Sequence, residues 1–155
     1  MRVFLVQHGE ARPETEDPER RLSEEGVRNV QKVARFLQPL GLKVETIWQS
    51  GKPRAQQTAE ILAGAVSAGQ GVVQHNGLAP KDPVAPVRQA IVQSPGDLMI
   101  VGHLPFLGKL AGLLVADKEE TEIVVFRFGC VVCVERIEDG PWKLAWMIVP
   151  GLLGA

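Results

Sequence analysis

Two histidines and an arginine stand at positions where a strand is expected to end. They are His8, which follows the apolar run 2–7 (RVFLVQ); Arg54, which follows the run 46–49 and a short turn; and His103, which follows the run 97–101 and Gly102. A neutral imidazole can attack phosphorus, and guanidinium or protonated imidazole groups stabilise the charged oxygens of a transferring phosphoryl group. If these side chains meet, they form a site for phosphoryl transfer.

The hydropathy pattern predicts the elements that would bring them together. Short apolar runs predict strands, and apolar residues at three- and four-residue spacing predict helices. The predicted strands are 2–7, 46–49, 72–74 and 97–101, the helices 27–37, 54–65, 84–94 and 104–115, and a final meander of strands 122–127, 130–137 and 142–149. This order predicts an α/β fold, a three-layer α/β/α sandwich whose mostly parallel sheet has an antiparallel edge strand. Ligands of such sheets bind beyond the carboxyl ends of the strands, where all three residues would lie.

Length and composition favour one domain spanning residues 1–155, because 155 residues with 45% hydrophobic content can bury a single core. The N-terminal residues resemble neither a secretory signal nor a membrane span, so we expect a cytoplasmic protein. A net charge of −1, without a long run of one sign, gives no reason to expect a nucleic-acid or membrane partner. Cys130 and Cys133 lie three apart in a predicted strand, so they should point to opposite faces as packed thiols.

Three motifs resemble those of a known family. They are Val6–Glu10 (VQHGE), similar to the Arg-His-Gly signature; Ser50–Thr58 (SGKPRAQQT), similar to a Ser-x-x-x-Arg-Ala-x-Gln-Thr block; and Val101–Pro105 (VGHLP), similar to a second-histidine block. Together they resemble the histidine phosphatase superfamily, whose founding members include the cofactor-dependent phosphoglycerate mutases. The short chain and the segment Arg20–Gly26 (RRLSEEG) resemble more narrowly the SixA-like branch, which dephosphorylates phosphohistidine on proteins.

The resemblance implies a phosphoglycerate mutase-like fold and a role for each matching residue. His8 would take the phosphoryl group, while Arg54 and His103 would hold it. Gln7, Gly9, Arg20 and Ser50 would bind substrate, with Arg20 at the rim of the pocket. Water would then release phosphate, and neither a metal nor another cofactor is required. The implied partner is a protein that carries phosphohistidine.

One position departs from the family pattern, because Gln7 stands where the family has its first pocket arginine. Glutamine donates a hydrogen bond without charge, and losing a charge-assisted contact costs roughly 1.5–3 kcal/mol, or about one to two decades in rate. Arg12, Arg20 or Lys52 could compensate. The general acid is a second open question, for which Asp82 is a candidate, although a turn residue between Lys81 and Pro83 explains it equally well.

Three functions therefore stay open. The first is a phosphohistidine phosphatase acting on a protein, for which an external acid matters less because the leaving nitrogen can be protonated beforehand. The second is a phosphomonoesterase for small esters that would use Asp82. The third is a phosphate-binding protein that has lost turnover through Gln7. Glu10 is expected to orient the loop after His8, and His75 has no setting that suggests chemistry.

Overall fold

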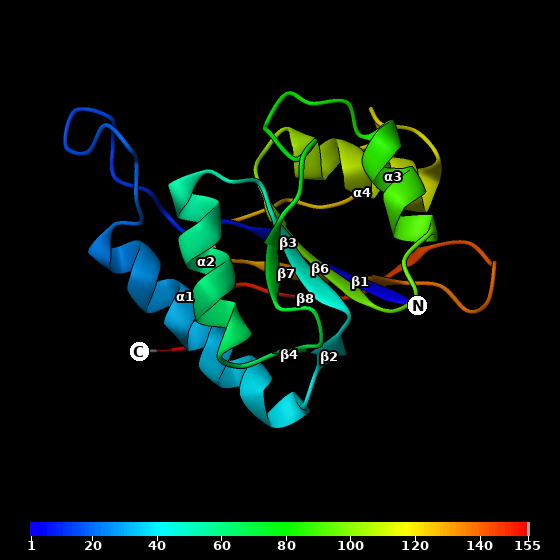
Figure 1. Ribbon diagram of the computed structural model, residues 1–155, viewed down its shortest axis with the longest axis horizontal. Coiled ribbons are helices and arrows are strands. Elements are labelled where there is room, and N and C mark those ends of the chain that lie inside the picture. The colour runs from blue at the N-terminus through cyan, green and yellow to red at the C-terminus, as the bar shows by residue number, and fades with distance from the viewer. Residues whose placement is uncertain (155) are drawn as a thin grey trace.

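A six-stranded sheet between two pairs of helices forms the body of the protein in the computed structural model, which describes residues 1–154 (Figure 1). Ala155, the last residue of the predicted domain, lies outside the described residues. The sheet strands are β1 (Arg2–Gln7), β3 (Thr46–Gln49), β5 (Val72–Gln74), β6 (Leu98–Gly102), β7 (Val131–Glu135) and β8 (Lys143–Ile148). The helices are α1 (Glu24–Leu37), α2 (Pro53–Ala63), α3 (Ala85–Val92) and α4 (Phe106–Ala116), with short 3-10 turns η1 (Gln38–Leu40) and η2 (Pro150–Leu152).

The strand order β5-β3-β6-β1-β7-β8 places β1 and β6 side by side in the middle of the sheet. The first four strands in this order are parallel, and β7 is antiparallel to both of its neighbours. The antiparallel strand is therefore next to the edge, and β8 occupies the edge itself. Since Gln7 pairs with Gly102, the residues that follow β1 and β6 leave the sheet at the same level.

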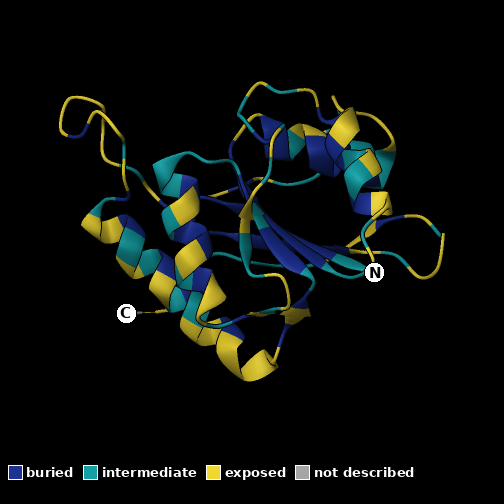
Figure 2. Cartoon of the chain, viewed as in Figure 1, coloured by how far each residue is buried: buried dark blue, intermediate teal, exposed yellow. Residues whose placement is uncertain are grey.

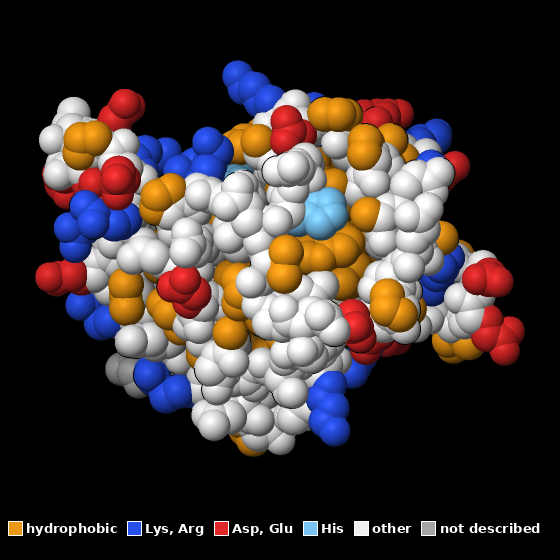
Figure 3. Space-filling model, viewed as in Figure 1, with side chains coloured by type: hydrophobic (Ala, Val, Ile, Leu, Met, Phe, Trp, Pro, Cys, Tyr) orange, Lys and Arg blue, Asp and Glu red, His pale blue; other side chains and the backbone are white. Residues whose placement is uncertain are grey.

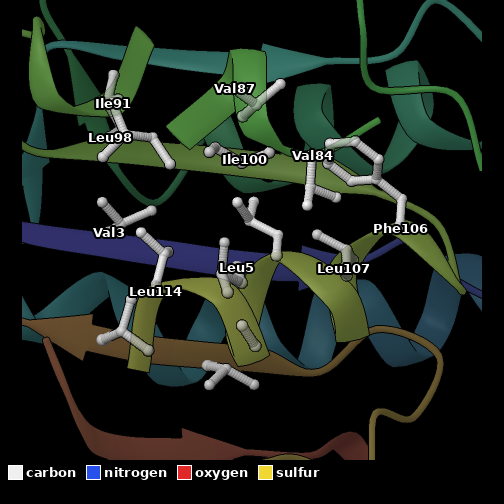
Figure 4. Packing of buried hydrophobic residues seen from close by; sticks show 14 of the residues in the cluster. Val3, Leu5, Val84, Val87, Ile91, Leu98, Ile100, Phe106, Leu107 and Leu114 are labelled. Carbon is white, nitrogen blue, oxygen red and sulfur yellow. The ribbon is translucent and has the colours of Figure 1, made fainter. Parts of the chain in front are cut away.

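Each face of the sheet carries its own core, so the predicted three-layer α/β/α sandwich is confirmed. On one face α1 and α2 pack against side chains such as Phe4 and Val6. On the other face α3 and α4 pack against Val3 and Leu5, as Figure 4 shows. This alternation follows from the two-residue period of a strand. Figure 2 shows the central strands buried and the outer helix faces exposed, as expected for a sheet covered on both sides.

The predicted strand 122–127 is wrong, because this segment has no strand partner and runs as an extended loop. The free edge of β1 is taken by β7, so the sheet has no place for another strand there. Phe126 and Val124 instead pack into the core on the side of α4. The predicted meander is thus one hairpin, β7 and β8. The sequence also gave no sign of a separate two-stranded sheet formed by β2 (Lys43–Val44) and β4 (Ser67–Ala68).

The two cysteines behave as predicted. Both are buried free thiols, Cys130 in the core on the α3 and α4 side and Cys133 in the core on the α1 and α2 side. Burial raises the pKa of the Cys133 thiol to about 11, which keeps it protonated. In the part of the chain the structure describes, no helix is long and apolar enough to cross a membrane.

Candidate active site

His8 lies directly beyond β1 and is almost fully buried, with 6% of its surface exposed. Its Nδ1 lies 2.6 Å from the carbonyl oxygen of Gly9, an acceptor, so Nδ1 carries the ring proton. Nε2 therefore holds the lone pair, and the only hydrogen bond of the ring to residues 1–154 is the one through Nδ1. Burial is the main cause that lowers the pKa of His8 to about 4, the Gly9 hydrogen bond opposes it, and the charges of Arg54 and Arg20 lower it further. At neutral pH His8 is a neutral imidazole with a free nitrogen.

His103 lies just beyond β6, and its ring centroid is 4.9 Å from that of His8. The side chain is 1% exposed, Nε2 lies 2.6 Å from the hydroxyl of Ser50, and the enclosed Nδ1 has no partner among the described residues. Burial, then the charges of His8 and Arg54, lower the pKa of His103 to about 3. In the free site His103 is therefore neutral, and its role as a protonated donor to phosphate stays a prediction. A bound phosphoryl dianion would favour its protonation.

Three basic side chains give the pocket its positive potential. Arg54 is the second residue of α2, and burial followed by the charge of Arg20 lowers its pKa. The positive charges of Lys52 and Arg20 lower the pKa of His103, and the charge of Arg20 also lowers the pKa of His8. Lys and Arg side chains gather near the start of α2 in Figure 3. Of the residues proposed to compensate for Gln7, Arg20 and Lys52 thus contribute charge, whereas Arg12 supplies the backbone oxygen that accepts from Arg20 Nε at 3.3 Å.

The loop that carries His8 is held by contacts the sequence motifs did not reveal. Gly9 N–H donates to Thr58 Oγ1 at 3.0 Å, and Thr58 Oγ1 donates to the Arg54 carbonyl at 2.8 Å, so one side chain joins the β1 loop to the first turns of α2. A Cβ on Gly9 would lie 2.8 Å from Val30 Cγ2, which leaves no space for a larger residue. Thr58 is therefore a positioning residue, whose only sequence signal was its place in the Ser50–Thr58 motif.

Gln7 is the last residue of β1 and is 6% exposed. Its side-chain oxygen Oε1 is enclosed and has no hydrogen-bond partner among residues 1–154, whereas its carbonyl oxygen accepts from Gly129 N–H at 3.0 Å. An enclosed amide oxygen without a partner is costly. The backbone at Gln7 is thus fixed by Gly129, while its side-chain amide oxygen is free of protein partners in residues 1–154.

Glu10 and Asp82 both have structural partners. Glu10 Oε1 accepts from Ser23 Oγ at 2.8 Å, and Ser23 caps α1 by accepting from Gly26 N–H at 3.0 Å, so Glu10 orients the loop as expected. Asp82 Oδ2 accepts from Ala79 N–H at 2.9 Å, and this closes the turn before α3. That contact favours the turn role of Asp82, while its role as a general acid stays a prediction.

His8 and His75 each also contact an aromatic ring. The ring of Phe128 lies 5.6 Å from the ring of His8, although 49% of Phe128 is exposed. Gly129 N–H also approaches the carbonyl of His8 at 3.2 Å, so the 128–129 turn adjoins the site. No sequence motif pointed to Phe128. His75 stacks on Trp48, with 4.1 Å between the ring centroids. It is not among the residues that shift the pKa values of His8 and His103.

The arrangement combines the neutral imidazole of His8 with positively charged side chains around it. His8 offers a free Nε2, and Arg54 keeps an enclosed Nε–H with no partner among residues 1–154. Such a site favours a ligand with several negatively charged oxygens. Residues 1–154 contain no cluster of three or more His, Cys, Asp or Glu side chains placed to hold a metal ion.

Comparison with known proteins gives the family. The model of the histidine phosphatase superfamily (branch 1) matches residues 3–79, which include His8 and Arg54. An uncharacterized protein of Picosynechococcus sp. (strain PCC 7002) is 36% identical over 118 residues, covering 72% of this chain and 71% of that protein. The protein histidine phosphatase SixA, solved with tungstate, superposes with a TM-score of 0.85 at 24% identity, covering 99% of this chain and all of that one.

A more distant structure shares the same fold. A phosphoserine phosphatase mutant of Entamoeba histolytica in complex with phosphoserine superposes with a TM-score of 0.65 at 14% identity, covering 94% of this chain and 95% of that one. The SixA superposition covers 99% of this chain and so extends well beyond the matched residues 3–79. On its motifs, its fold and these matches, the chain belongs to the histidine phosphatase superfamily.

Proposed function

We propose that this protein is a phosphatase that removes the phosphoryl group from phosphohistidine on a partner protein. The observation that carries the proposal is the state of His8, whose Nδ1 proton is bound to Gly9 and whose pKa is lowered to about 4. A neutral imidazole with one free nitrogen is a nucleophile without further activation. Arg54 and His103 stand beside it to receive the phosphoryl oxygens.

The reaction has two displacements. Nε2 of His8 attacks phosphorus, a new N–P bond forms, and the bond from phosphorus to the substrate nitrogen breaks as that nitrogen leaves in protonated form. Water then attacks phosphorus, the bond to Nε2 breaks, inorganic phosphate leaves and neutral His8 returns. Negative charge on the equatorial oxygens is stabilised by the Arg54 guanidinium and by His103, which becomes a better donor once the dianion is bound.

A phosphoramidate substrate suits the groups present. Its leaving nitrogen can take a proton before the bond breaks, so the reaction needs no strong general acid from the protein. The Asp82 carboxylate accepts from Ala79 N–H and has no contact with His8 or His103 among the described hydrogen bonds. The similarity to SixA, a protein histidine phosphatase, agrees with a protein substrate.

A small-ester phosphatase is the second candidate, because the phosphoserine phosphatase of E. histolytica shares the fold. This candidate requires an acid for the alcohol leaving group, and Asp82 is the residue assigned to it. The Asp82→Asn substitution separates the two ideas. Loss of turnover of an alkyl ester such as phosphoserine would support the ester phosphatase, and unchanged turnover would remove it.

The central experiment measures phosphate release by the native chain from a peptide containing phosphohistidine and from p-nitrophenyl phosphate. His8→Ala should abolish release from both, whereas His75→Ala, a matched histidine variant away from the pocket charges, should not change it. Native inactivity with recovery in Gln7→Arg would show a phosphate-binding protein in place of an active enzyme. Equal activity of the native chain and His8→Ala would overturn the mechanism.

A further inference from the structure

A groove of about 460 Å³ lies beside the active site, between the start of α4 and the loop that follows this helix. Several of its lining residues are neighbours of site residues in the sequence. Leu104 and Pro105 directly follow His103, and Phe126 lies two residues before Phe128, whose ring contacts His8. A ligand that places a phosphoryl group on His8 can therefore extend into this groove.

The groove is lined by apolar and acidic side chains. Leu104 is 41% exposed and Val125 is 67% exposed, so the groove presents aliphatic surface to solvent. The charged residues of its lining are Lys109, Glu119, Glu120 and Glu122, which gives one positive and three negative charges, a net charge of −2. Figure 3 shows acidic side chains over this part of the molecule. The groove is thus opposite in sign to the pocket around Arg54.

The wall that carries the acidic residues is fixed before any ligand binds. Lys118 N–H donates to the Gly112 carbonyl at 3.2 Å, and a Cβ on Gly112 would lie 2.5 Å from the Thr121 carbonyl oxygen. The 118–121 segment therefore packs directly on the backbone of α4. Asp117, at the end of the helix, also accepts from Arg88 at 2.9 Å. A preformed wall lowers the ordering cost of binding.

We propose that this groove docks the polypeptide next to the phosphorylated residue of a partner, and that it selects segments with both basic and apolar side chains. This inference rests on the proposed function, because the phosphoryl group is what brings the segment to His8. Basic residues would pair with Glu119, Glu120 and Glu122, and an apolar residue would cover Leu104 and Val125. A small phosphate ester would not reach the groove, so the groove distinguishes protein substrates from small ones.

The test compares three substrates of the native chain. Two are peptides of equal length with a central phosphohistidine, one flanked by Lys and Leu and the other by Asp and Ser, and the third is p-nitrophenyl phosphate. The variant Glu119→Gln/Glu120→Gln/Glu122→Gln removes three exposed carboxylates. We expect kcat/KM for the basic peptide to fall about 10-fold, mostly through KM, as expected for three exposed ion pairs, with p-nitrophenyl phosphate turnover unchanged.

A matched control removes the same charge elsewhere. The control residues Glu135, Glu138 and Asp139 are exposed at the other end of the sheet. There Glu135 on β7 lies opposite Arg2, the first residue of β1, in the strand register. The variant Glu135→Gln/Glu138→Gln/Asp139→Asn should leave all three substrates unaffected. Val125→Ser should weaken the Lys-Leu peptide in the same way as the first triple variant, through loss of apolar contact.

The outcomes for docking and for catalysis are separable. Equal kcat/KM for the two peptides in the native chain, with p-nitrophenyl phosphate still hydrolysed, overturns the docking proposal and leaves the phosphatase intact. If the native chain hydrolyses none of the three substrates, fluorescence anisotropy of the labelled, unphosphorylated Lys-Leu peptide decides the docking question. If the native chain binds this peptide and the variant without Glu119, Glu120 and Glu122 does not, docking in the groove is supported. If the two proteins bind it equally, the docking proposal is overturned.

Discussion

The two buried histidines should make the free protein sensitive to mild acid. The pKa of His8 is lowered to about 4 and that of His103 to about 3, from an ordinary value of 6.5. At pH values between these lowered pKa values and 6.5, the two histidines are protonated in the unfolded chain but neutral in the native protein. The stabilisation is therefore fully present above about pH 6.5 and is lost as the pH falls toward 4 and then 3.

The loss of stability at mild acid follows from the pKa values of His8 and His103. At pH 5 an unfolded histidine is almost fully protonated while both native histidines are still neutral. Relative to pH 8, each then lowers the free energy of unfolding by about 2 kcal/mol, and the two together by about 4 kcal/mol. Asp17, whose pKa is lowered to about 2 by its hydrogen bond to Arg21, adds a loss of the same sign only below about pH 4. A loss of about 4 kcal/mol is a large part of the 5–15 kcal/mol typical of a domain.

The assay is urea unfolding at pH 8 and pH 5, followed by tryptophan fluorescence. The native chain should lose about 4 kcal/mol between the two pH values, and His8→Asn or His103→Asn about 2 kcal/mol each, because one titrating group has been removed. His75→Ala should keep the full native difference. An identical loss in the native chain and both Asn variants would refute the conclusion that burial holds these rings neutral.

The remaining predictions concern the frame and charge of the site. Gly9→Ala should lower the free energy of unfolding by about 1–3 kcal/mol, since its Cβ would lie 2.8 Å from Val30, whereas Gly151→Ala, with open space around it, should change it by less than about 0.5 kcal/mol. Thr58→Val should cost about 1–3 kcal/mol in chemical denaturation, because it leaves Gly9 N–H unpaired, and should lower kcat for phosphate release. Gln7→Arg should raise kcat/KM on the phosphohistidine peptide by about 10-fold or more; an unchanged or lower value would show that Arg20 and Lys52 already supply enough charge.

The sequence was informative wherever a local pattern determines position. A buried strand that stops at a Gly-His or His-Gly pair predicts where that histidine lies, since parallel strands end at a common edge. His8 and His103 were placed together in this way, and their ring centroids are 4.9 Å apart. The opposite orientations of Cys130 and Cys133 followed from the same two-residue period.

Contacts between distant segments were not accessible to the same reasoning. The pattern of 122–127 is that of a strand, but a strand forms only where a neighbouring edge is free, and β7 already occupies the edge of β1. Phe128 approaches His8 only because the loop after α4 returns to the carboxyl end of β1, where Gly129 binds the backbone of Gln7. Neither the availability of an edge nor the path of a loop is encoded in a short window of residues.

The positive charges around His8 and His103 explain what changes when Gln7 replaces the family arginine. The positive charges of Arg54 and Arg20 already lower the pKa of His8 in the free site, and Lys52 adds to their effect on His103. Another arginine at position 7 would increase this repulsion and strengthen the hold on any phosphate dianion. A neutral amide relieves it, so a phosphate product should bind less tightly and leave faster. The cost in phosphoryl transfer and the gain in product release act on different steps, and a comparison of single-turnover with steady-state rates in Gln7→Arg would separate them.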